Sequence, residues 1–328
     1  MKITPIFHIL SILIMPLSGF MIVSGFVDLV YNDQNWINFF ISATITLFVG
    51  MSVFLATRGH NDQNIDLRQA FVLTTMSWIT IAFFGALPFY LSNINLNFTD
   101  SFFESMSGIT TTGSTILISI EASPPGILVW RSLLQWLGGI GVIVMAIAIF
   151  PMLSVGGMQL FKAENFENPE KVVPRATSLT RGIFIIYSVL TLIWASLLYF
   201  SGMSSFDSIL HSMTTIATGG YSTKSGSIGA FNSQLIDWII ILGMIFGSLP
   251  FVHYLAITKG SYRDLIKDSQ VRWFLVLLTI LVLTIFSLLF LNGTYDWKDS
   301  IRYSAFNVTS ILTGTGYGTA DFGLWGGF

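Results

Sequence analysis

The run Thr313-Gly314-Thr315-Gly316-Tyr317-Gly318 sets threonine, glycine and tyrosine side by side directly after an apolar segment. Two similar runs precede it, Thr110-Thr111-Thr112-Gly113-Ser114 and Ala217-Thr218-Gly219-Gly220-Tyr221-Ser222. A polar loop that carries glycine is hard to accommodate between hydrophobic spans unless it lines an aqueous path. The carbonyl oxygens of such a loop can replace the water shell of an alkali cation. The three runs therefore indicate ion permeation.

The composition around these runs is that of a membrane protein. Apolar residues make up 53% of the 328 positions and charged residues only 10%, whereas about 25% of an average soluble domain is charged. Windows of about 20 apolar residues recur, long enough to cross a hydrocarbon core of about 30 Å. We expect an all-α polytopic membrane protein in contact with lipid. The predicted spans are Thr4–Val30, Trp36–Thr57, Gln69–Leu91, Gly126–Met152, Arg181–Gly202, Gln234–Thr258 and Arg272–Leu291, with an eighth beginning near Phe322.

Several classes of function are disfavoured by the same composition. The absence of cysteine excludes disulfides and thiolate metal sites, and a net charge of −2 gives no reason to expect a nucleic-acid partner. The sequence contains no His-Glu-x-x-His motif, no carboxylate dyad at helical spacing and no serine elbow. We therefore predict no enzyme activity, no catalytic residue and no cofactor.

The threonine-glycine runs recur about every 100 residues, so the architecture is interpreted from the repeat. Each unit contains a long apolar span, a shorter helix, the glycine loop and then a second long span. We predict an N-terminal accessory transmembrane hairpin at 1–66, pore repeat 1 at 67–175 and pore repeat 2 at 176–268. An incomplete pore repeat 3 follows at 269–328, and a fourth repeat is absent.

The short helices share a register relative to their glycines. Asp100 and Asp207 each lie 13 residues before the glycine of their run and are predicted as helix N-caps. Asp299 lies 17 residues before Gly316, so either the third helix is one turn longer or this match is accidental. The side chains nine residues before the glycines are polar but differ from one another: Glu104, His211 and Asn307. The side chains six residues before the glycines all carry a hydroxyl: Ser107, Thr214 and Ser310.

Aligned on Gly113, Gly220 and Gly316, the loops have a pattern suited to cation coordination. Glycine accepts positive φ and can present consecutive carbonyls to one side, threonine stiffens the preceding backbone, and the helix carboxyl end adds partial negative charge. The alternative is that the glycines are only turn residues. The carbonyls predicted to bind potassium are those of Thr111, Thr112, Gly113, Thr218, Gly219, Gly220, Gly314, Thr315 and Gly316.

These loops and three further motifs resemble the Trk/Ktr/HKT superfamily of potassium transporters, and the bacterial Trk-type membrane subunit most of all. The motifs are Trp130-Arg131-Ser132-Leu133-Leu134-Gln135-Trp136-Leu137-Gly138-Gly139-Ile140-Gly141, Gly247-Ser248-Leu249-Pro250-Phe251 and Thr313–Asp321. The resemblance implies four non-identical helix–pore-loop–helix repeats around a pseudo-fourfold pore. It also implies a homodimer and a cytosolic nucleotide-binding regulatory (TrkA-like) subunit.

The sequence departs from this family pattern because it carries three filter loops and ends at Phe328. We expect a C-terminally truncated fragment; the alternative is that a second polypeptide supplies the remaining repeat.

The expected function is potassium uptake across the bacterial inner membrane. Most basic residues fall on one side if the N-terminus is cytoplasmic and the loops face the periplasm. Glycine at the key position of all three loops favours potassium over sodium. Channel-like conduction and coupling to protons or sodium both remain open. The alternatives are an alternating-access cation carrier and a non-conducting fragment of such a transporter.

Three kinds of side chain have two interpretations each. Arg131 either pairs with Glu104 or extends to the lipid headgroups. Gly138, Gly139 and Gly141 are interpreted as helix-packing positions rather than ligands. His211 is interpreted as a packed polar contact rather than a pH-sensitive group.

Overall fold

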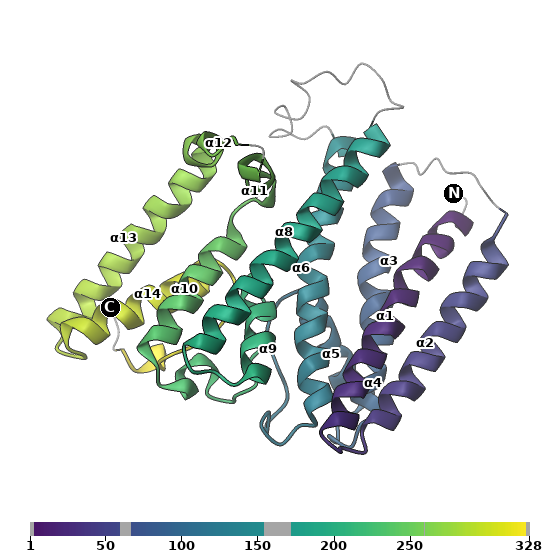
Figure 1. Ribbon diagram of the computed structural model, residues 1–328, viewed down its shortest axis with the longest axis horizontal. Helices are drawn as coiled ribbons and strands as arrows, with labels where there is room; N and C mark the ends of the chain where they lie inside the picture. Colours follow the sequence, from purple (N-terminus) through teal and green to yellow (C-terminus); the bar gives the residue numbers. More distant parts are fainter. Residues whose placement is uncertain (1–2, 60–66, 154–171, 259, 326–328) are drawn as a thin grey trace. The chain divides into compact units, whose positions relative to one another are not determined.

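The computed structural model describes residues 3–59, 67–153, 172–258 and 260–325, and every regular element in these ranges is helical. The chain divides into two compact units (Figure 1). Unit 1 comprises Met1–Thr110 and Ala122–Thr180, and unit 2 comprises Thr111–Glu121 and Arg181–Phe328. The first glycine loop therefore groups with the second and third loops, and not with the helices that flank it in the sequence.

The helices of unit 1 are α1 (Thr4–Val30), α2 (Trp36–Thr57), α3 (Leu67–Gly85), α4 (Leu87–Leu91), α5 (Phe98–Ile109), α6 (Pro125–Leu153) and the first turns of α8 (Val172–Phe200). Unit 2 holds the rest of α8, then α9 (Ser205–Ile216), η2 (Ser227–Phe231), α10 (Gln234–Ser248), α11 (Phe251–Thr258), α12 (Arg263–Lys267), α13 (Ser269–Leu291), α14 (Trp297–Leu312) and η3 (Phe322–Leu324).

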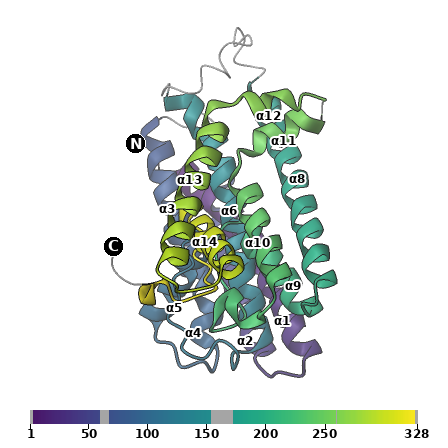
Figure 2. The same ribbon diagram turned by 90° about the vertical axis from the view of Figure 1, so that its left-hand side faces the viewer.

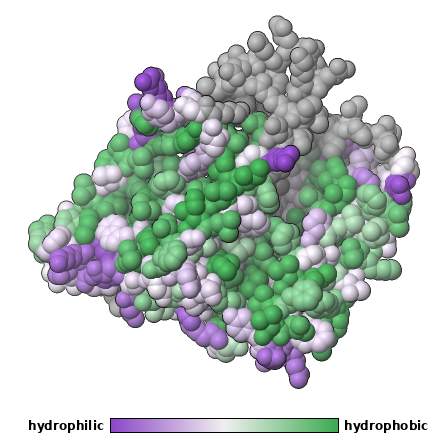
Figure 3. All heavy atoms as spheres, viewed as in Figure 1, coloured by the Kyte–Doolittle hydropathy of each residue, from purple (hydrophilic) through white to green (hydrophobic). Residues whose placement is uncertain are grey.

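Most predicted spans are confirmed. Helices α1 and α2 have the predicted bounds, and α6 matches the predicted Gly126–Met152 closely. Among the described residues, five helical stretches are long and apolar enough to cross a membrane: Thr4–Val30, Trp36–Thr57, Arg68–Leu91, Leu179–Phe200 and Ser269–Leu291. Large apolar side chains remain exposed on these helices, and green apolar surface covers much of the view in Figure 3. The chain is a multi-pass membrane protein.

One predicted span is interrupted by a bend, and another lies within a longer helix. The stretch Gln234–Thr258 is not one helix: α10 and α11 meet at 90°, because Pro250 lacks an N–H and forces Leu249 into an extended conformation. The Tyr254 hydroxyl donates to the Phe246 carbonyl across this bend (2.7 Å). The apolar stretch Leu179–Phe200 of α8 agrees with the predicted Arg181–Gly202 within two residues. The helix itself begins earlier, at Val172, with Pro174 in its first turn, where proline is tolerated.

In unit 1 a glycine allows α1 and α2 to pack closely, and a buried carboxylate joins α1 to α6. Helix α1 contacts α2, α3 and α6. A Cβ at Gly50 would lie 2.9 Å from Met15 Cγ, so glycine permits the close approach of α1 and α2. The buried Asp28 carboxylate accepts hydrogen bonds from the Asn35 side chain (2.9 Å) and from the backbone N–H of Gly126, at the start of α6.

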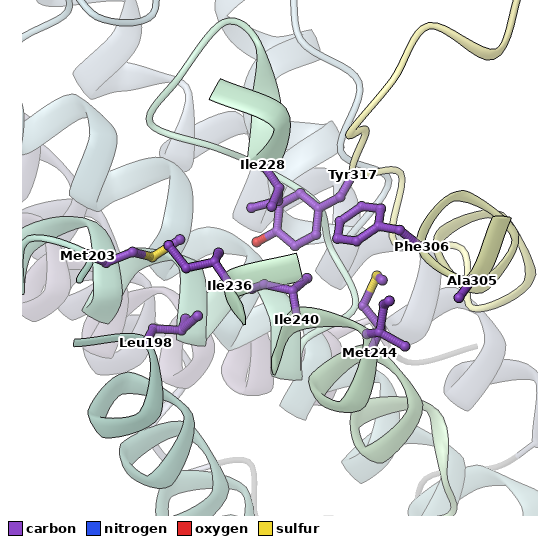
Figure 4. Packing of buried hydrophobic residues seen from close by; sticks show 10 residues of the cluster. Leu198, Met203, Ile228, Ile236, Ile240, Met244, Ala305, Phe306 and Tyr317 are labelled. Carbon is purple, nitrogen blue, oxygen red and sulfur yellow. The ribbon is translucent and has the colours of Figure 1, made fainter. Parts of the chain in front are cut away.

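In unit 2 the packing centres on α10, which contacts both α9 and α14 (Figure 2). The buried cluster joins residues of α8, α10 and α14 to the third glycine loop (Figure 4): Leu198, Met203, Ile228, Ile236, Ile240, Ile241, Met244, Ala305, Phe306 and Tyr317. In lipid the apolar surface gains little from leaving water, so close van der Waals packing supplies most of the stabilisation. The cluster therefore holds loop 3 against α10.

Candidate functional site

The short helices that lead into the glycine loops begin with the same cap. In each, the N-cap side chain accepts a hydrogen bond from the backbone N–H of the aspartate three residues later, at 2.8 to 3.0 Å. The N-caps are Asn97, Ser204 and Asp296, and the aspartates are Asp100, Asp207 and Asp299. The prediction that Asp100 and Asp207 are N-caps is wrong: they occupy the third helical position, where a carboxylate is favoured by the helix dipole.

The third of these helices is one turn longer than the others. Helices α5 and α9 have 12 residues each, whereas α14 has 16. Asp299 occupies the same cap position in α14 that Asp100 and Asp207 occupy in theirs. Of the two interpretations that the sequence allowed, the longer helix is confirmed, and the Asp299-Ser300 match is not accidental.

Each helix is followed by a loop in which two residues have positive φ. We call Thr111–Thr115, Thr218–Ser222 and Gly314–Gly318 loops 1, 2 and 3, and number positions from their central glycine, at position zero. Position zero has φ of 80°, 77° and 84° in loops 1 to 3, and position −2 has φ of 55°, 50° and 73°. The three loops therefore share one backbone conformation, although their sequences differ.

At position −2 this conformation is strained in two of the three loops. Thr111 and Thr218 are β-branched, and a β-branched residue at positive φ is a genuine outlier. Such strain costs about 1 to 3 kcal/mol per residue and persists only where the surroundings impose it. Gly314 adopts the same conformation in loop 3 without this cost. Strain at matched positions indicates a functional constraint on the backbone.

Hydrogen bonds to the preceding helix decide which way the loop carbonyls face. The amide of Gly219 donates to the Thr214 carbonyl (2.8 Å), and the amide of Thr315 donates to the Ser310 carbonyl (2.9 Å). The N–H and C=O of a trans peptide point in opposite directions. The carbonyl of the residue before each amide, at position −2, therefore points away from the helix.

The three loops lie side by side within unit 2. A Cβ built on Gly113 would lie 2.2 Å from the carbonyl oxygen of Gly219, and one built on Gly220 would lie 1.8 Å from that of Thr315. No side chain fits at either glycine, so both are required by close approach as well as by positive φ. The Tyr221 hydroxyl also donates to the Ser114 carbonyl (3.3 Å). Backbone oxygens from three loops are thus crowded together, an arrangement that a cation would stabilise.

The structure brings the nine predicted ligand residues together in unit 2, from Thr111 to Gly113 in loop 1, Thr218 to Gly220 in loop 2 and Gly314 to Gly316 in loop 3. Their carbonyls are not shown to bind an ion, so the ligand assignment stays a prediction. The alternative that the glycines are only turn residues does not account for the contacts between loops.

The side chains at position −9 are buried and hydrogen-bonded. In unit 1, Arg131 Nε donates to Glu104 Oε1 at 2.8 Å, with both side chains at most 1% exposed. The predicted pairing is therefore confirmed, and Arg131 does not extend to lipid headgroups. Nitrogen Nε2 of His211 lies 3.0 Å from Ser222 Oγ, and Nδ1 lies 2.8 Å from the Asp207 carbonyl. His211 is thus a packed polar contact.

Asn307 has the matching position on α14 and binds a residue just beyond loop 3. Its Nδ2 donates to Thr319 Oγ1 (3.1 Å) and to the Tyr303 carbonyl (2.9 Å). In loops 2 and 3 the polar side chain at position −9 therefore reaches the residues that follow the glycine. Different residues perform the same task, which explains why the sequence shows polarity there without identity.

The predicted packing role of glycine in α6 is confirmed at one position. A Cβ on Gly138 would lie 1.9 Å from the carbonyl of Ile109, the last residue of α5, whereas Gly141 has open space around it. Gly247 in α10 faces the Ile216 carbonyl, at the end of α9, in the same way (2.7 Å). This second contact was missed by the sequence analysis, although Gly247 was part of a quoted motif.

Comparison with known proteins supplies the family. The model of the family TrkH, described as a cation transport protein, matches residues 35–327. The Trk system potassium uptake protein TrkI of Halomonas elongata is 40% identical over 323 residues, and TrkH of Escherichia coli is 36% identical over 324 residues. These alignments include 98% and 97% of this chain, but only 65% and 67% of those proteins. The chain thus spans about two thirds of the length of its relatives.

A solved structure shows the same fold. The crystal structure of the potassium transporter TrkH from Vibrio parahaemolyticus aligns with a TM-score of 0.88 and 32% identity, covering 98% of this chain and 66% of that one.

Proposed function

The chain belongs to the TrkH family of cation transport proteins, and from this premise we propose that it takes part in potassium uptake through a path lined by loops 1 to 3. The contact of each loop with the next carries the proposal: Gly113 faces the Gly219 carbonyl, and Gly220 faces the Thr315 carbonyl. The names of the relatives as potassium uptake proteins support it.

The chemistry follows from the orientation of the backbone. In loops 2 and 3 the amides at position −1 donate to the preceding helix, so the carbonyls at position −2 face away from it. Neutral carbonyl dipoles can strip water from a monovalent cation without the buried counter-charge that would trap it. The strained φ of Thr111 and Thr218 fits this role, because the loops then hold their carbonyls in the binding arrangement before the ion arrives. In this proposal the carbonyls of all nine residues from positions −2 to zero are the ligands.

Selectivity and surroundings belong to the same proposal. Glycine at position zero lets a neighbouring loop approach closely in loops 1 and 2. With glycine also at this position in loop 3, we infer a preference for potassium over sodium. We place the protein in the bacterial inner membrane, with the N-terminus in the cytoplasm and the loops facing the periplasm. A homodimer and a cytosolic nucleotide-binding subunit are further parts of the proposal that rest on family resemblance alone.

The test is rescue of cells that lack their own potassium uptake systems. The protein, expressed from its complete reading frame, is expected to restore growth in millimolar potassium and rubidium uptake. The change Gly113→Ser is expected to raise sodium uptake relative to potassium, because the new Cβ would lie 2.2 Å from the Gly219 oxygen and must displace one of the two loops. Gly19→Ser is the matched control, because its Cβ meets nothing within 4 Å.

Two results would contradict the proposal. If the wild-type protein reaches the membrane but does not support potassium uptake, the proposed function is wrong. Unaltered potassium and sodium uptake in the Gly113→Ser protein would remove the assignment of loop 1 to the ion path.

A further inference from the structure

Tyr317 lies immediately after the glycine of loop 3 and is bonded at both of its ends. The side chain is buried, with 2% of its surface exposed. Its backbone carbonyl accepts a hydrogen bond from Ser310 Oγ (2.7 Å), on the helix that leads into the same loop. Its hydroxyl forms a hydrogen bond with Thr214 Oγ1, on the helix that leads into loop 2. Ser310 and Thr214 both occupy position −6.

The hydroxyl of Tyr317 is buried against α9, where several oxygens lie within hydrogen-bond distance. Thr215 Oγ1 donates to it at 3.4 Å, and the His211 carbonyl lies at the same distance. Thr214 Oγ1 also donates to the Leu210 carbonyl (3.1 Å), and either hydroxyl can be the donor in the bond between Thr214 and Tyr317. Removing this hydroxyl would remove the buried hydrogen bonds that it forms with Thr214 and Thr215.

The ring of Tyr317 is held by packing as well. Figure 4 shows it between Ile228 of η2 and Phe306 of α14, within the buried cluster of unit 2. The ring is rigid, with only two rotatable bonds, so it fixes the separation between its backbone in loop 3 and its hydroxyl partner on α9. A displacement of either loop must break a hydrogen bond or disturb this packing.

The outer part of loop 3 has its carbonyls occupied by protein donors. The Tyr317 carbonyl accepts from Ser310, and the Gly318 carbonyl accepts from the amide of Gly229 (3.0 Å). The Gly318 amide in turn donates to Ser227 Oγ (3.2 Å). These hydrogen bonds hold the backbone that follows Gly316 in place.

We propose that Tyr317 is a specificity-determining positioning residue, clamped between the hydroxyls of Thr214 and Ser310, that sets the distance between loops 2 and 3. This proposal rests on the proposed function of the loops as an ion path. A carbonyl cage discriminates between potassium and sodium by its dimensions or by the number of oxygens it presents, and the clamp controls both at loop 3.

Loop 2 offers an internal comparison. Tyr221 follows Gly220 as Tyr317 follows Gly316, and its hydroxyl donates to the Ser114 carbonyl of loop 1 over a longer distance, 3.3 Å. Loop 1 has serine at this place. In loops 2 and 3 the tyrosine that follows the central glycine therefore reaches a residue about 100 positions earlier in the chain.

The experiment compares potassium and sodium uptake, with KM and maximal rate for each ion, in proteins expressed from the complete reading frame. Tyr317→Phe and Thr214→Val each remove one side of the bond, and Thr214→Ser restores the hydroxyl. Each disruptive change is expected to lower the potassium-to-sodium ratio about five- to tenfold, the effect of about one buried hydrogen bond. The double variant is expected to be no worse than either single one.

Controls separate the clamp from general damage to the fold. Ser212→Ala removes a buried hydroxyl of α9 that bonds only to the Ile209 carbonyl of its own helix (2.7 Å), and it is expected to leave the ratio unchanged. Ser310→Ala tests the other end of the clamp and is expected to lower the ratio, whereas Ser310→Thr is expected to retain it. If Tyr317→Phe fails to reach the membrane, the Thr214 and Ser310 pairs of variants decide.

The outcomes are distinguishable. A wild-type protein that prefers potassium, with an unchanged ratio in Tyr317→Phe and Thr214→Val, overturns the clamp and leaves the proposed function standing. A Thr214→Ser protein as impaired as Thr214→Val also overturns the clamp. A wild-type protein that carries no potassium removes the proposed function, and this inference with it.

Discussion

Two threonines of the loops adopt backbone conformations that are unfavourable for their residue type, so loops 1 and 2 are strained. Thr111 and Thr218 are β-branched residues at φ of 55° and 50°. Glycine at the same position in loop 3 shows that the backbone shape is kept while the residue varies. The strain at Thr111 and Thr218 must therefore be offset elsewhere. A loop that is rigid and already in the conformation needed to bind an ion would offset it.

The strain at Thr218 can be measured by changing the side chain. Asparagine tolerates positive φ, and valine keeps the β-branch while losing the hydroxyl. We expect Thr218→Asn to stabilise the protein against unfolding by about 1 kcal/mol and Thr218→Val to destabilise it by a similar amount. Thermal unfolding in detergent measures both. The same exchanges at Thr284, in the middle of α13, serve as the control, and an equal gain from asparagine there would argue against relief of strain.

The buried pair of Arg131 and Glu104 leads to a second expectation at this scale. Removing one partner leaves the other charge buried, which costs roughly 3 to 5 kcal/mol. We expect Arg131→Gln and Glu104→Gln each to lower stability by that order, and the double variant to lose less than the sum. Chemical or thermal unfolding of the four proteins completes the cycle. Additive losses would mean that the 2.8 Å contact contributes no coupling.

At the scale of elements, the same cap begins each short helix and the same hydrogen bonds end it. The caps were partly misassigned from the sequence because aspartate is common both at the N-cap and three residues later. The sequence allowed either an extra turn in α14 or an accidental match at Asp299, because the spacing of Asp299 from Gly316 differs from that in the other two helices. The local sequence allows more than one position for a helix end, and the three-dimensional structure shows which one is used.

Helix α13 provides an element-scale prediction with a defined dependence on pH. Asp268 caps this helix, and the backbone N–H of Val271, aided by that of Gln270 and by His253, lowers the pKa of its carboxyl below the ordinary 3.8. A carboxylate whose pKa is lower in the folded state stabilises the fold above its unfolded pKa, and this stabilisation disappears as the pH falls through the folded pKa. Asp268→Asn is therefore expected to flatten the acid limb of the stability curve.

The measurement is thermal stability in detergent from about pH 6 down to about pH 3. The wild-type protein is expected to lose stability relative to Asp268→Asn only at the acid end. Asp264→Asn, on the neighbouring α12, is the control. Parallel curves for wild type and Asp268→Asn over the whole range would contradict the assignment of the cap.

At the scale of the whole molecule, unit 2 combines long apolar helices, α8 and α13 among them, with a small polar region built from loops. Unit 2 gathers all three loops, although loop 1 lies between two helices of unit 1 in the sequence. Such an arrangement concentrates the backbone polar groups where they bond with one another, which is the condition for irregular backbone in a membrane.

The orientation of the chain in the membrane can be tested directly, because the sequence contains no cysteine. A single cysteine at Lys224, just beyond loop 2, is expected to react with a membrane-impermeant thiol reagent added to intact spheroplasts. A single cysteine at Ser261, between α11 and α12, is expected to react only after permeabilisation. The reverse pattern would invert the proposed topology, and the unmodified protein gives the background.

The sequence by itself determined the membrane class, the positions of most spans, the spacing of the three loops and the family, because each of these depends on composition or on local pattern. A run of apolar residues spans a bilayer whatever it packs against. The matched hydroxyls at position −6 were visible in the sequence too, but their roles were not.

Only the tertiary structure decided how the loops meet. Sequence could not place the Gly219 carbonyl against Gly113, the Thr315 carbonyl against Gly220, or the Tyr317 hydroxyl against Thr214, since these contacts join residues about 100 positions apart. It also could not show that Pro250 turns one span into two helices at 90° rather than a gentle kink. Contacts of this kind arise from packing between distant segments, whereas a local pattern carries information only about its own neighbours.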